Sequence, residues 1–486
     1  MSRYESEPVH LVFLPSAGLG HLNPCLRTAS LFLRHGCKVT LITPKPTVSI
    51  AESNLMSRFC SSFPHHQVAS IDLNLTPLDP TTVNTNDPFW LHFETIRRSV
   101  HLVAPIISSL STPPSAFIFD VSLISPLVPI IEKLSCPCYI YFIAPARMFS
   151  FFAHLSVLSA SNNQGAHEYA HPCSFIGDSV KIPGIETPIP RSSVPPPLLQ
   201  PNTLFERIFM EDSPKLKKLN GIFINSFEQL EGEALAALNE GKVVEGLPPV
   251  LAVGPFMECE FEKVEQGEGG GSIMSSIFEW LDEKCEGSVV YVCMGNRTAT
   301  RREQIKDMAL GLVECGYSFL WVVKLKVVDK EEEEDGLEDV LGSELMKKVK
   351  EKGRVVKDYV KQMKILGHPS VGGFVSHGGW NSIIEAVWEG VPILSWAQHG
   401  DQKIASDVVR MSGVGIWPEE WGWGTKEVVK GEEIAKRINE MMSNETLRVK
   451  AGEMMEAARR AAGVGGSCEA IVKRQIEEWK RNAQAN

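Results

Sequence analysis

The chain has 486 residues, 43% of them hydrophobic and 22% charged, a composition that fits a globular protein with room for two domains. Its formal net charge of −11 disfavours non-specific binding to nucleic acid or to an anionic membrane. The eleven cysteines have no paired metal-ligand spacing, so we expect reduced thiols and no metal site. The sequence shows no signal region and no membrane-length apolar stretch, and we therefore expect a cytoplasmic protein. We also expect a monomer.

The first predicted elements are a strand, a glycine-containing loop and a helix. The apolar run over residues 9–14 predicts the strand, "PSAGLGHLNP" follows as the loop, and residues 37–43 form the next strand after a helix. The loop lacks the third glycine of a dinucleotide fingerprint, because Asn23 stands there, and His21 follows its second glycine. The loop is therefore either an incomplete cofactor loop or a loop that presents a histidine.

A second apolar strand in the first half ends on an acid. Asp120 closes the run "AFIFD", and ligands of open parallel sheets bind at the carboxyl ends of strands, so His21 and Asp120 should share one edge. A carboxylate bonded to one imidazole nitrogen fixes the tautomer and stabilises the imidazolium. We predict His21 as a general base oriented by Asp120. The alternative is a helix-capping histidine and a turn aspartate.

The same order of elements recurs in the second half of the chain. Residues 288–294 predict a strand, a loop and a helix follow, and residues 318–323 predict the next strand. Two such openings imply an α/β protein with two doubly wound parallel-sheet domains. The stretches "EGLPPVLAVGPF" and "EQGEGGGS" suit a linker. We place the domains at residues 1–252 and 253–464, and a closing helix that packs back on the first domain at residues 465–486.

The densest cluster of unusual residues spans residues 359–402. It contains a predicted strand "VGGFVS", a tight turn "HGGWNS" and a helix "IIEAVWEGVP". A helix start with glycines before it binds phosphate without a metal. His377, Asn381 and Ser382 add donors, and Glu385 is placed to accept hydrogen bonds from a ribose diol. Singly each residue also fits a structural role, but together they predict a nucleotide diphosphate site.

This segment resembles the signature box of plant family 1 glycosyltransferases, which use UDP-sugars and have the GT-B fold of two Rossmann-like domains facing across a cleft. The resemblance covers nearly the whole chain, including "SAGLGHLNP", and implies the same base and orienter, His21 and Asp120. It also implies an inverting transfer that needs no cofactor beyond the donor, UDP-glucose. The candidate UDP-sugar-binding residues are Gly20, Asn296, Arg297, Tyr359, Val360, Gln362, His377, Trp380, Asn381, Ser382, Glu385, Asp401 and Gln402.

By this resemblance Tyr359 stacks on uracil, Glu385 holds the ribose, and Asp401 with Gln402 holds the sugar hydroxyls. Among the candidate donor residues, two positions depart from the family pattern. Tyr359 stands where the family usually has Trp, and Asn296 stands where many members have Ser. We expect both departures to be tolerated, and donor affinity is the property on which they bear.

The predicted acceptor site is apolar, because flat phenols bind such pockets. Its candidates come from the first half of the chain and from one histidine of the signature segment: Phe89, Trp90, Phe142, Met148, Phe152 and His399. For each aromatic or methionine position, an ordinary core role is the alternative.

Four local sequences look like the plant C-glycosyltransferase branch, which acts on flavonoid-type acceptors such as 2-hydroxyflavanones and dihydrochalcones. They are "DPFW", "FDVSLISPL", "ARMFSFFAHL" and "NRTATRREQI". A deprotonated phloroglucinol-type ring attacks through oxygen or carbon, and orientation decides which. We expect a C-glucosyltransferase whose partners are a UDP-sugar and a small phenol. An O-glucosyltransferase and a non-catalytic nucleotide-binding module remain alternatives, and a dehydrogenase is disfavoured because neither glycine loop completes the dinucleotide fingerprint.

Overall fold

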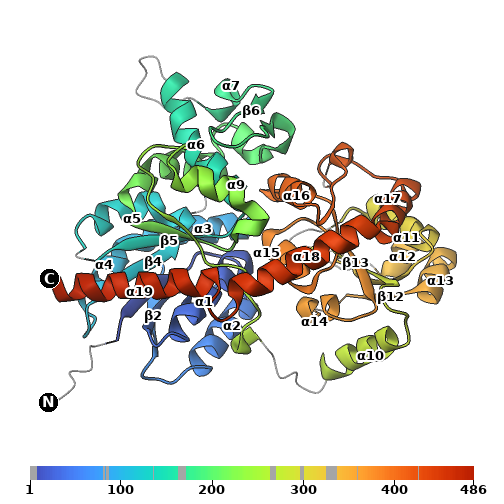
Figure 1. Ribbon diagram of the computed structural model, residues 1–486, viewed down its shortest axis with the longest axis horizontal. Helices are drawn as coiled ribbons and strands as arrows, with labels where there is room; N and C mark the ends of the chain where they lie inside the picture. The colour runs from blue at the N-terminus through green and yellow to red at the C-terminus, as the bar shows by residue number, and fades with distance from the viewer. Residues whose placement is uncertain are drawn as a thin grey trace. The chain divides into compact units, whose positions relative to one another are not determined.

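The chain folds into two compact units, Met1–Val264 with Arg460–Asn486, and Glu265–Arg459. Each unit contains a parallel β-sheet with helices packed on it (Figure 1). This confirms the predicted class of two Rossmann-like α/β domains. The computed structural model describes residues 8–79, 81, 83, 87–134, 136–162, 171–262, 270–295, 300–324, 336–357, 360–424 and 426–485.

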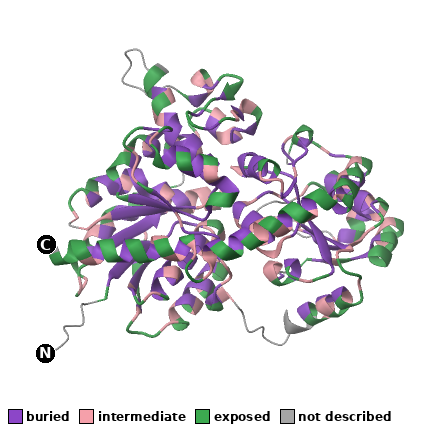
Figure 2. Ribbon diagram, viewed as in Figure 1, coloured by how far each residue is buried: buried purple, intermediate pink, exposed green. Residues whose placement is uncertain are grey.

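The sheet of the first unit has seven strands in the order β3-β2-β1-β4-β5-β8-β9, and every neighbouring pair is parallel. The central strands β1, β4 and β5 are buried along their whole length, which explains their continuous apolar sequences (Figure 2). The strands are β1 (His10–Leu14), β2 (Lys38–Lys45), β3 (Val68–Asn74), β4 (Ala116–Asp120), β5 (Cys138–Phe142), β8 (Gly221–Ile224) and β9 (Val250–Ala252). A separate antiparallel pair is formed by β6 (Ser179–Val180) and β7 (Ile189–Pro190).

Helices connect and cover these strands. The α-helices of the first unit are α1 (Leu19–Leu33), α2 (Ile50–Ser61), α3 (Pro88–Ser99), α4 (Val103–Ser108), α5 (Ile124–Ile131), α6 (Ala146–Asn162), α7 (Pro172–Phe175), α8 (Leu204–Asp212), α9 (Glu228–Asn239) and α19 (Ser467–Ala485). Its 3₁₀ turns are η2 (Val100–Leu102), η3 (Val121–Leu123), η4 (Arg191–Ser193), η5 (Pro196–Leu199), η6 (Ser213–Lys218) and η7 (Glu260–Glu262).

The boundaries between the units differ from those placed on the sequence. We set the first boundary at residue 253, but the chain beyond β9 still packs with the first unit. Val253 and Phe261 lie in its core, and Glu262 pairs with Arg27 at 2.8 Å. The closing helix α19 begins at Ser467 and also belongs to this core, through residues that include Trp479 (Figure 1).

The sheet of the second unit has six parallel strands in the order β12-β11-β10-β13-β14-β15. They are β10 (Val289–Cys293), β11 (Ser318–Val322), β12 (Gly353–Val356), β13 (Val371–Ser376), β14 (Ile393–Ser395) and β15 (Gly415–Ile416). The helices are α10 (Gly270–Asp282), α11 (Arg302–Glu314), α12 (Leu337–Leu341), α13 (Ser343–Lys352), α14 (Gln362–Leu366), α15 (Trp380–Glu389), α16 (Gln402–Met411), η8 (Glu419–Trp421), α17 (Gly431–Ser443) and α18 (Glu445–Ala462).

Each sheet reverses its strand order at one place. In the first sheet the chain runs outward from β1 through β2 to β3, and the later strands build on the other side from β4. In the second sheet β10 and β13 are the corresponding neighbours. Such a switch point leaves a crevice at the carboxyl ends of the two strands, where ligands of α/β proteins bind.

Candidate functional site

The switch point of the first sheet brings His21 and Asp120 together. His21 lies in the first turn of α1, directly after β1, and Asp120 is the last residue of β4. The His21 Nδ1 atom is 2.8 Å from Asp120 Oδ2. This bond assigns the ring proton to Nδ1, which leaves Nε2 as the nitrogen that accepts a proton. The structure therefore has the geometry of an oriented base.

Asp120 is held from two sides. Its Oδ1 accepts hydrogen bonds from the Ser122 backbone N–H at 2.9 Å and from the Ser122 hydroxyl at 2.6 Å. Burial by itself would raise the pKa of this carboxyl, which has no exposed side-chain surface. The charge and hydrogen bond of His21, together with the bonds from Ser122, outweigh burial and hold the pKa of Asp120 below its ordinary value. Asp120 is thus ionised at neutral pH.

The glycine loop before α1 makes room for an aromatic ring. Gly18 has φ of +90°, and a Cβ atom there would lie 2.7 Å from Phe89 Cε2. The neighbouring Phe93 contacts the imidazole of His21 edge-on, with ring centroids 5.5 Å apart. Gly18 therefore makes room for a ring of the aromatic group that packs beside His21.

Aromatic rings continue from Phe93 across α3 and α8. Phe89 and Trp90 contact each other at 5.2 Å between centroids, and Trp90 contacts Phe205 at 6.1 Å. Phe205 stacks on Phe209 at 4.4 Å. Phe89, Trp90, Phe205 and Phe209 are each partly exposed. A row of contacting rings with exposed surface thus begins beside His21.

The other predicted acceptor residues lie deeper. Phe142 (5% exposed), Met148 (2%) and Phe152 (2%) belong to the packed interior, where Phe152 meets Phe209 at 5.0 Å. His399 is exposed and belongs to the second unit. In this structure Phe89 and Trp90 are therefore the predicted aromatic residues with surface available to a ligand.

His377 stands at the switch point of the second sheet, just after β13. A Cβ atom on Gly295 would lie 2.8 Å from its Nε2, and one on Gly379 would lie 2.4 Å from it. Only glycine leaves room for the ring at these two positions. Within the described chain its buried Nδ1 has no hydrogen-bond partner.

The surroundings of His377 keep it neutral. Burial lowers its pKa to about 4, nearby His399 acts in the same direction, and a backbone interaction with Cys293 opposes both. At neutral pH the imidazole is therefore a hydrogen-bonding group without a charge. The positive end at this site is the start of α15, whose first turn has no side-chain cap.

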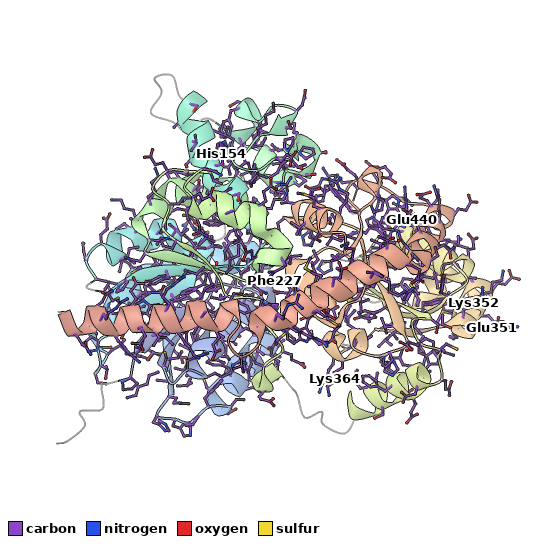
Figure 3. All side chains as sticks on the ribbon, in the orientation of Figure 1. His154, Phe227, Glu351, Lys352, Lys364 and Glu440 are labelled. Atoms are coloured by element: carbon purple, nitrogen blue, oxygen red, sulfur yellow. The ribbon has the colours of Figure 1, made fainter. Side chains whose placement is uncertain are left out.

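The side-chain amide of Gln362 binds two other predicted donor-site residues, Ser382 and Glu385. Its Nε2 donates to Ser382 Oγ at 2.9 Å and to Glu385 Oε2 at 2.7 Å. Gln362 begins α14, a short helix that Lys364 marks in Figure 3, and the other two lie on α15. The predicted helix started after "HGGWNS", but α15 begins at Trp380, so Ser382 belongs to its first turn.

The remaining predicted donor-site residues differ in surroundings. The Oε1 atom of buried Gln402 accepts from the backbone N–H groups of Gln398 at 2.8 Å and His399 at 3.0 Å. Asp401 occupies the N-cap position of α16. Val360 (5% exposed) and Trp380 (3%) are buried, whereas Asn381 is partly exposed and Gly20 is exposed. Asn296, Arg297 and Tyr359 lie outside the described residues.

Some residues of this arrangement were absent from the sequence prediction. Ser122 was missed, although an acid followed two residues later by serine is a common turn pattern. Phe205 and Phe209 were also missed, and their spacing of four on an amphipathic helix was the available signal. No local pattern links Phe93 to His21, because the two residues come from different helices.

Two Rossmann-like parallel-sheet units with polar residues at their switch points define a protein of the GT-B type. Residues 273–422 match the family described as UDP-glucoronosyl and UDP-glucosyl transferase. UDP-glycosyltransferase 708D1 of Glycine max is 72% identical over 98% of both chains. The chain belongs to the plant family 1 UDP-glycosyltransferases.

Further similarities place it within that family. UDP-glycosyltransferase CGT of Oryza sativa subsp. indica is 40% identical and covers 94% of this chain and 93% of its own. The structure of LpCGTa in complex with UDP is 39% identical, covers 97% of this chain and 99% of its own, and has a TM-score of 0.82. The relatives named CGT support membership of the C-glycosyltransferase branch. Within the described residues, no helix is long and apolar enough to cross a membrane.

Proposed function

We propose that this UDP-glycosyltransferase is an inverting, UDP-glucose-dependent C-glucosyltransferase of flavonoid-type phenolics, with His21 as its general base. The observation that carries the proposal is the 2.8 Å bond between His21 Nδ1 and the buried carboxylate of Asp120 at the first switch point. The similarity to relatives named CGT supports the C-linked product.

The base step follows from the tautomer. His21 Nε2 takes the proton of an acceptor hydroxyl, and Asp120 stabilises the imidazolium that forms. Phe93 packs edge-on against the ring and limits its rotation. The phenolate of a phloroglucinol-type ring carries its negative charge partly on the ring carbons ortho and para to the oxygen, so a carbon becomes a nucleophile.

The transfer itself is a single displacement. The ring carbon attacks C1 of glucose, the bond from C1 to the diphosphate oxygen breaks, and its electron pair leaves on UDP. The configuration at C1 inverts from α to β. The attacked ring carbon then loses its proton to solvent and the ring oxygen takes back the proton held by His21, so the aromatic phenol and the neutral base are both restored. The protein contributes the base and the orientation of the acceptor, which decides between carbon and oxygen.

We assign the donor to the second unit. The diphosphate interacts with the uncapped start of α15 and with neutral His377. The ribose diol donates to Glu385, whose orientation depends on the 2.7 Å bond from Gln362. The Gln402 amide oxygen is already used by the backbone, so its amide NH₂ group is the part assigned to a sugar hydroxyl, with Asp401 beside it.

Two solved relatives support this donor. LpCGTa was solved in complex with UDP, and UGT71G1 of Medicago truncatula, 26% identical with a TM-score of 0.82, was solved with UDP-glucose. UGT71G1 is aligned over 98% of this chain and 99% of its own. Because the α15 start and its donors stabilise the leaving UDP, the proposed reaction uses no metal and no further cofactor. Addition of EDTA is therefore expected to leave the rate unchanged.

We assign the acceptor to the partly exposed rings on α3 and α8. Phe89, Trp90, Phe205 and Phe209 contact one another in a row that Phe93 connects to His21. Flat phenols gain stacking energy from such rings, about 0.5–1.5 kcal/mol per pair beyond area burial. The phenolic hydroxyl is then presented to the base.

The test is incubation with UDP-glucose and the dihydrochalcone phloretin, followed by mass spectrometry before and after hot acid. A product that survives acid and fragments within the sugar ring supports a C-glucoside. A product cleaved back to phloretin means an O-glucoside, and the carbon-linked proposal fails. Absence of any product would contradict the proposed acceptor class.

His21→Ala tests the base in the same assay. Turnover is expected to fall by at least about a thousandfold, in the range seen when an oriented base is removed. Binding of UDP, measured by calorimetry, is expected to stay unchanged because the donor residues belong to the other unit. Retained turnover would show that His21 is not the general base.

A further inference from the structure

The carboxylate that orients His21 depends on a short turn. Asp120 ends β4, η3 covers the next three residues, and α5 begins directly afterwards. Asp120 Oδ1 is held by the N–H and hydroxyl of Ser122, while Oδ2 is bonded to His21. Any rotation of this turn changes the direction in which the carboxylate points.

A buried ion pair between Arg97 and Asp212 contacts the same turn. Arg97 of α3 donates through Nη1 to the Ser122 carbonyl oxygen, and the same nitrogen is 3.2 Å from Asp212 Oδ2. The Asp212 Oδ1 atom accepts from the Ser125 backbone N–H at 2.8 Å. Arg97 is 6% exposed and Asp212 is not exposed. The pair thus binds a backbone carbonyl within η3 and a backbone N–H in the first turn of α5.

Burying the charges of Arg97 and Asp212 costs free energy, so stability alone does not explain this pair. Burial raises the pKa of Asp212 to about 6, although the charge of Arg97 and the bonds from Arg97 and Ser125 lower it. Replacing a buried ion pair by apolar residues is often neutral or stabilising, so the reason for a charged pair here is better sought in geometry. Arg97 presents donors in a rigid planar fork, which suits simultaneous contacts to a carbonyl and a carboxylate.

The helices that supply the pair also carry the exposed aromatic rings. Arg97 lies on α3 with Phe89 and Trp90, and Asp212 ends α8, which carries Phe205 and Phe209. The turn that carries Asp120 is therefore tied to both helices assigned to the acceptor. A displacement of either helix is transmitted to the carboxylate through Arg97.

We infer that Arg97 and Asp212 are positioning residues: the pair sets the turn at Ser122 so that Asp120 orients His21 relative to an acceptor held on α3 and α8. This inference rests on the proposed function, because it assumes that His21 is the base. It adds two residues that touch neither substrate in the proposed assignment. Their contribution is expected in the chemical step rather than in donor binding.

Asp212→Asn is the main variant, with Glu211→Gln as its matched control. The amide keeps an oxygen for the Ser125 N–H, and Arg97 keeps a second acid, because its Nη2 is 3.2 Å from Glu211 Oε2. The control removes that acid, which is 37% exposed, and leaves Asp212 in place. We expect Asp212→Asn to lower kcat by about ten- to a hundredfold with KM for UDP-glucose unchanged. Glu211→Gln should stay within about twofold of the wild type.

Arg97→Lys and Arg97→Gln provide a second pair of variants. Lysine keeps the charge but lacks the planar fork, so kcat should lie between the wild-type value and that of Arg97→Gln. Equal kcat values for all three proteins, or a loss confined to thermal stability, would overturn the inference. A rise in KM for UDP-glucose with kcat unchanged would also overturn it.

A spectroscopic measurement separates this inference from the proposed function. The Nδ1–H proton of a histidine bonded to a carboxylate is strongly deshielded, and its signal can be assigned by its loss in His21→Ala. We expect this signal to shift or broaden in Asp212→Asn but not in Glu211→Gln. An unchanged signal overturns the positioning role. If His21→Ala keeps its turnover, the proposed base fails, while the signal still reports whether the pair orients the imidazole.

Discussion

The two histidines that lie at the switch points have different surroundings. His21 has a carboxylate partner at 2.8 Å, whereas the Nδ1 atom of His377 is buried without a partner in the part of the chain that the structure describes. Both residues follow a strand at a switch point. The first therefore suits proton transfer, and the second suits hydrogen bonding to an anion without adding a charge.

The neutral state of His377 predicts a pH dependence of folding. The pKa of His377 is lowered to about 4 in the folded chain, whereas an unfolded histidine titrates near about 6.5. Between these values the unfolded chain binds more protons, so stability falls as the pH decreases through this window and the loss is complete below the folded pKa. His377→Asn should lose less stability over the same range.

The measurement is the Tm of both proteins as a function of pH, and the difference between the two curves isolates this group. Other buried histidines, such as His10 and His154, contribute equally to both proteins. Parallel curves would contradict the assignment of a neutral His377.

At the scale of elements, the turn between β13 and α15 shows why glycine is needed. Gly378 has φ of +77°, and a Cβ atom there would lie 2.7 Å from Ser395 Oγ. Gly379 packs against the imidazole of His377. Because the helix then starts at Trp380, the N–H groups of its first turn, which have no side-chain cap, and the neutral histidine share one turn of the chain.

Gly379→Ala is expected to weaken UDP binding by about tenfold, because its Cβ would displace the His377 ring that we assign to the diphosphate. Calorimetric titration with UDP measures the effect. Gly452→Ala on α18 is the matched control, since a Cβ there meets no atom within 4 Å. The control should bind UDP normally and be as stable as the wild type or about 1 kcal/mol more stable. An unchanged affinity of Gly379→Ala for UDP would contradict the assignment of His377 to the donor site.

At the scale of the whole molecule, the last helix completes the core of the first unit. Trp479 of α19 is 1% exposed and contacts Phe32 and Tyr139 at 5.3 and 5.4 Å between ring centroids. Its Nε1 donates to the Tyr139 hydroxyl at 3.1 Å. The Sγ of Cys468 donates to the Val253 carbonyl oxygen at 2.8 Å. Residues from both ends of the chain therefore belong to one core.

Trp479→Ala is expected to lower the free energy of unfolding of the first unit by about 3–5 kcal/mol, the usual cost of removing a buried tryptophan. Urea unfolding followed by circular dichroism measures it. Lys473→Ala is the control on the same helix, because this lysine is 60% exposed and its ion pair with Glu469 contributes little. Similar losses for the two variants would mean that α19 contributes little to the core.

Much of the fold follows from local pattern. The strands at Ala116–Asp120 and Val371–Ser376 have the bounds that their apolar runs indicate. The encounter of His21 with Asp120 was also predictable, since Asp120 ends β4 and His21 lies in the first turn of the helix that follows the neighbouring parallel strand β1. The boundary near residue 253 was not, because Phe261 joins the first core through contacts with residues distant in sequence, such as Phe59 of α2.

The sequence by itself determined the class of this protein, its two parallel sheets and the residues at the strand ends. Those features depend on periodicity and on the fixed direction of parallel strands, which are local properties of the chain. The tertiary structure alone decided that Arg97 reaches Ser122 and Asp212, and that Phe205 and Phe209 continue a row of rings from His21. These contacts join separate helices, and the path of the folded chain, not any spacing in the sequence, brings them within reach.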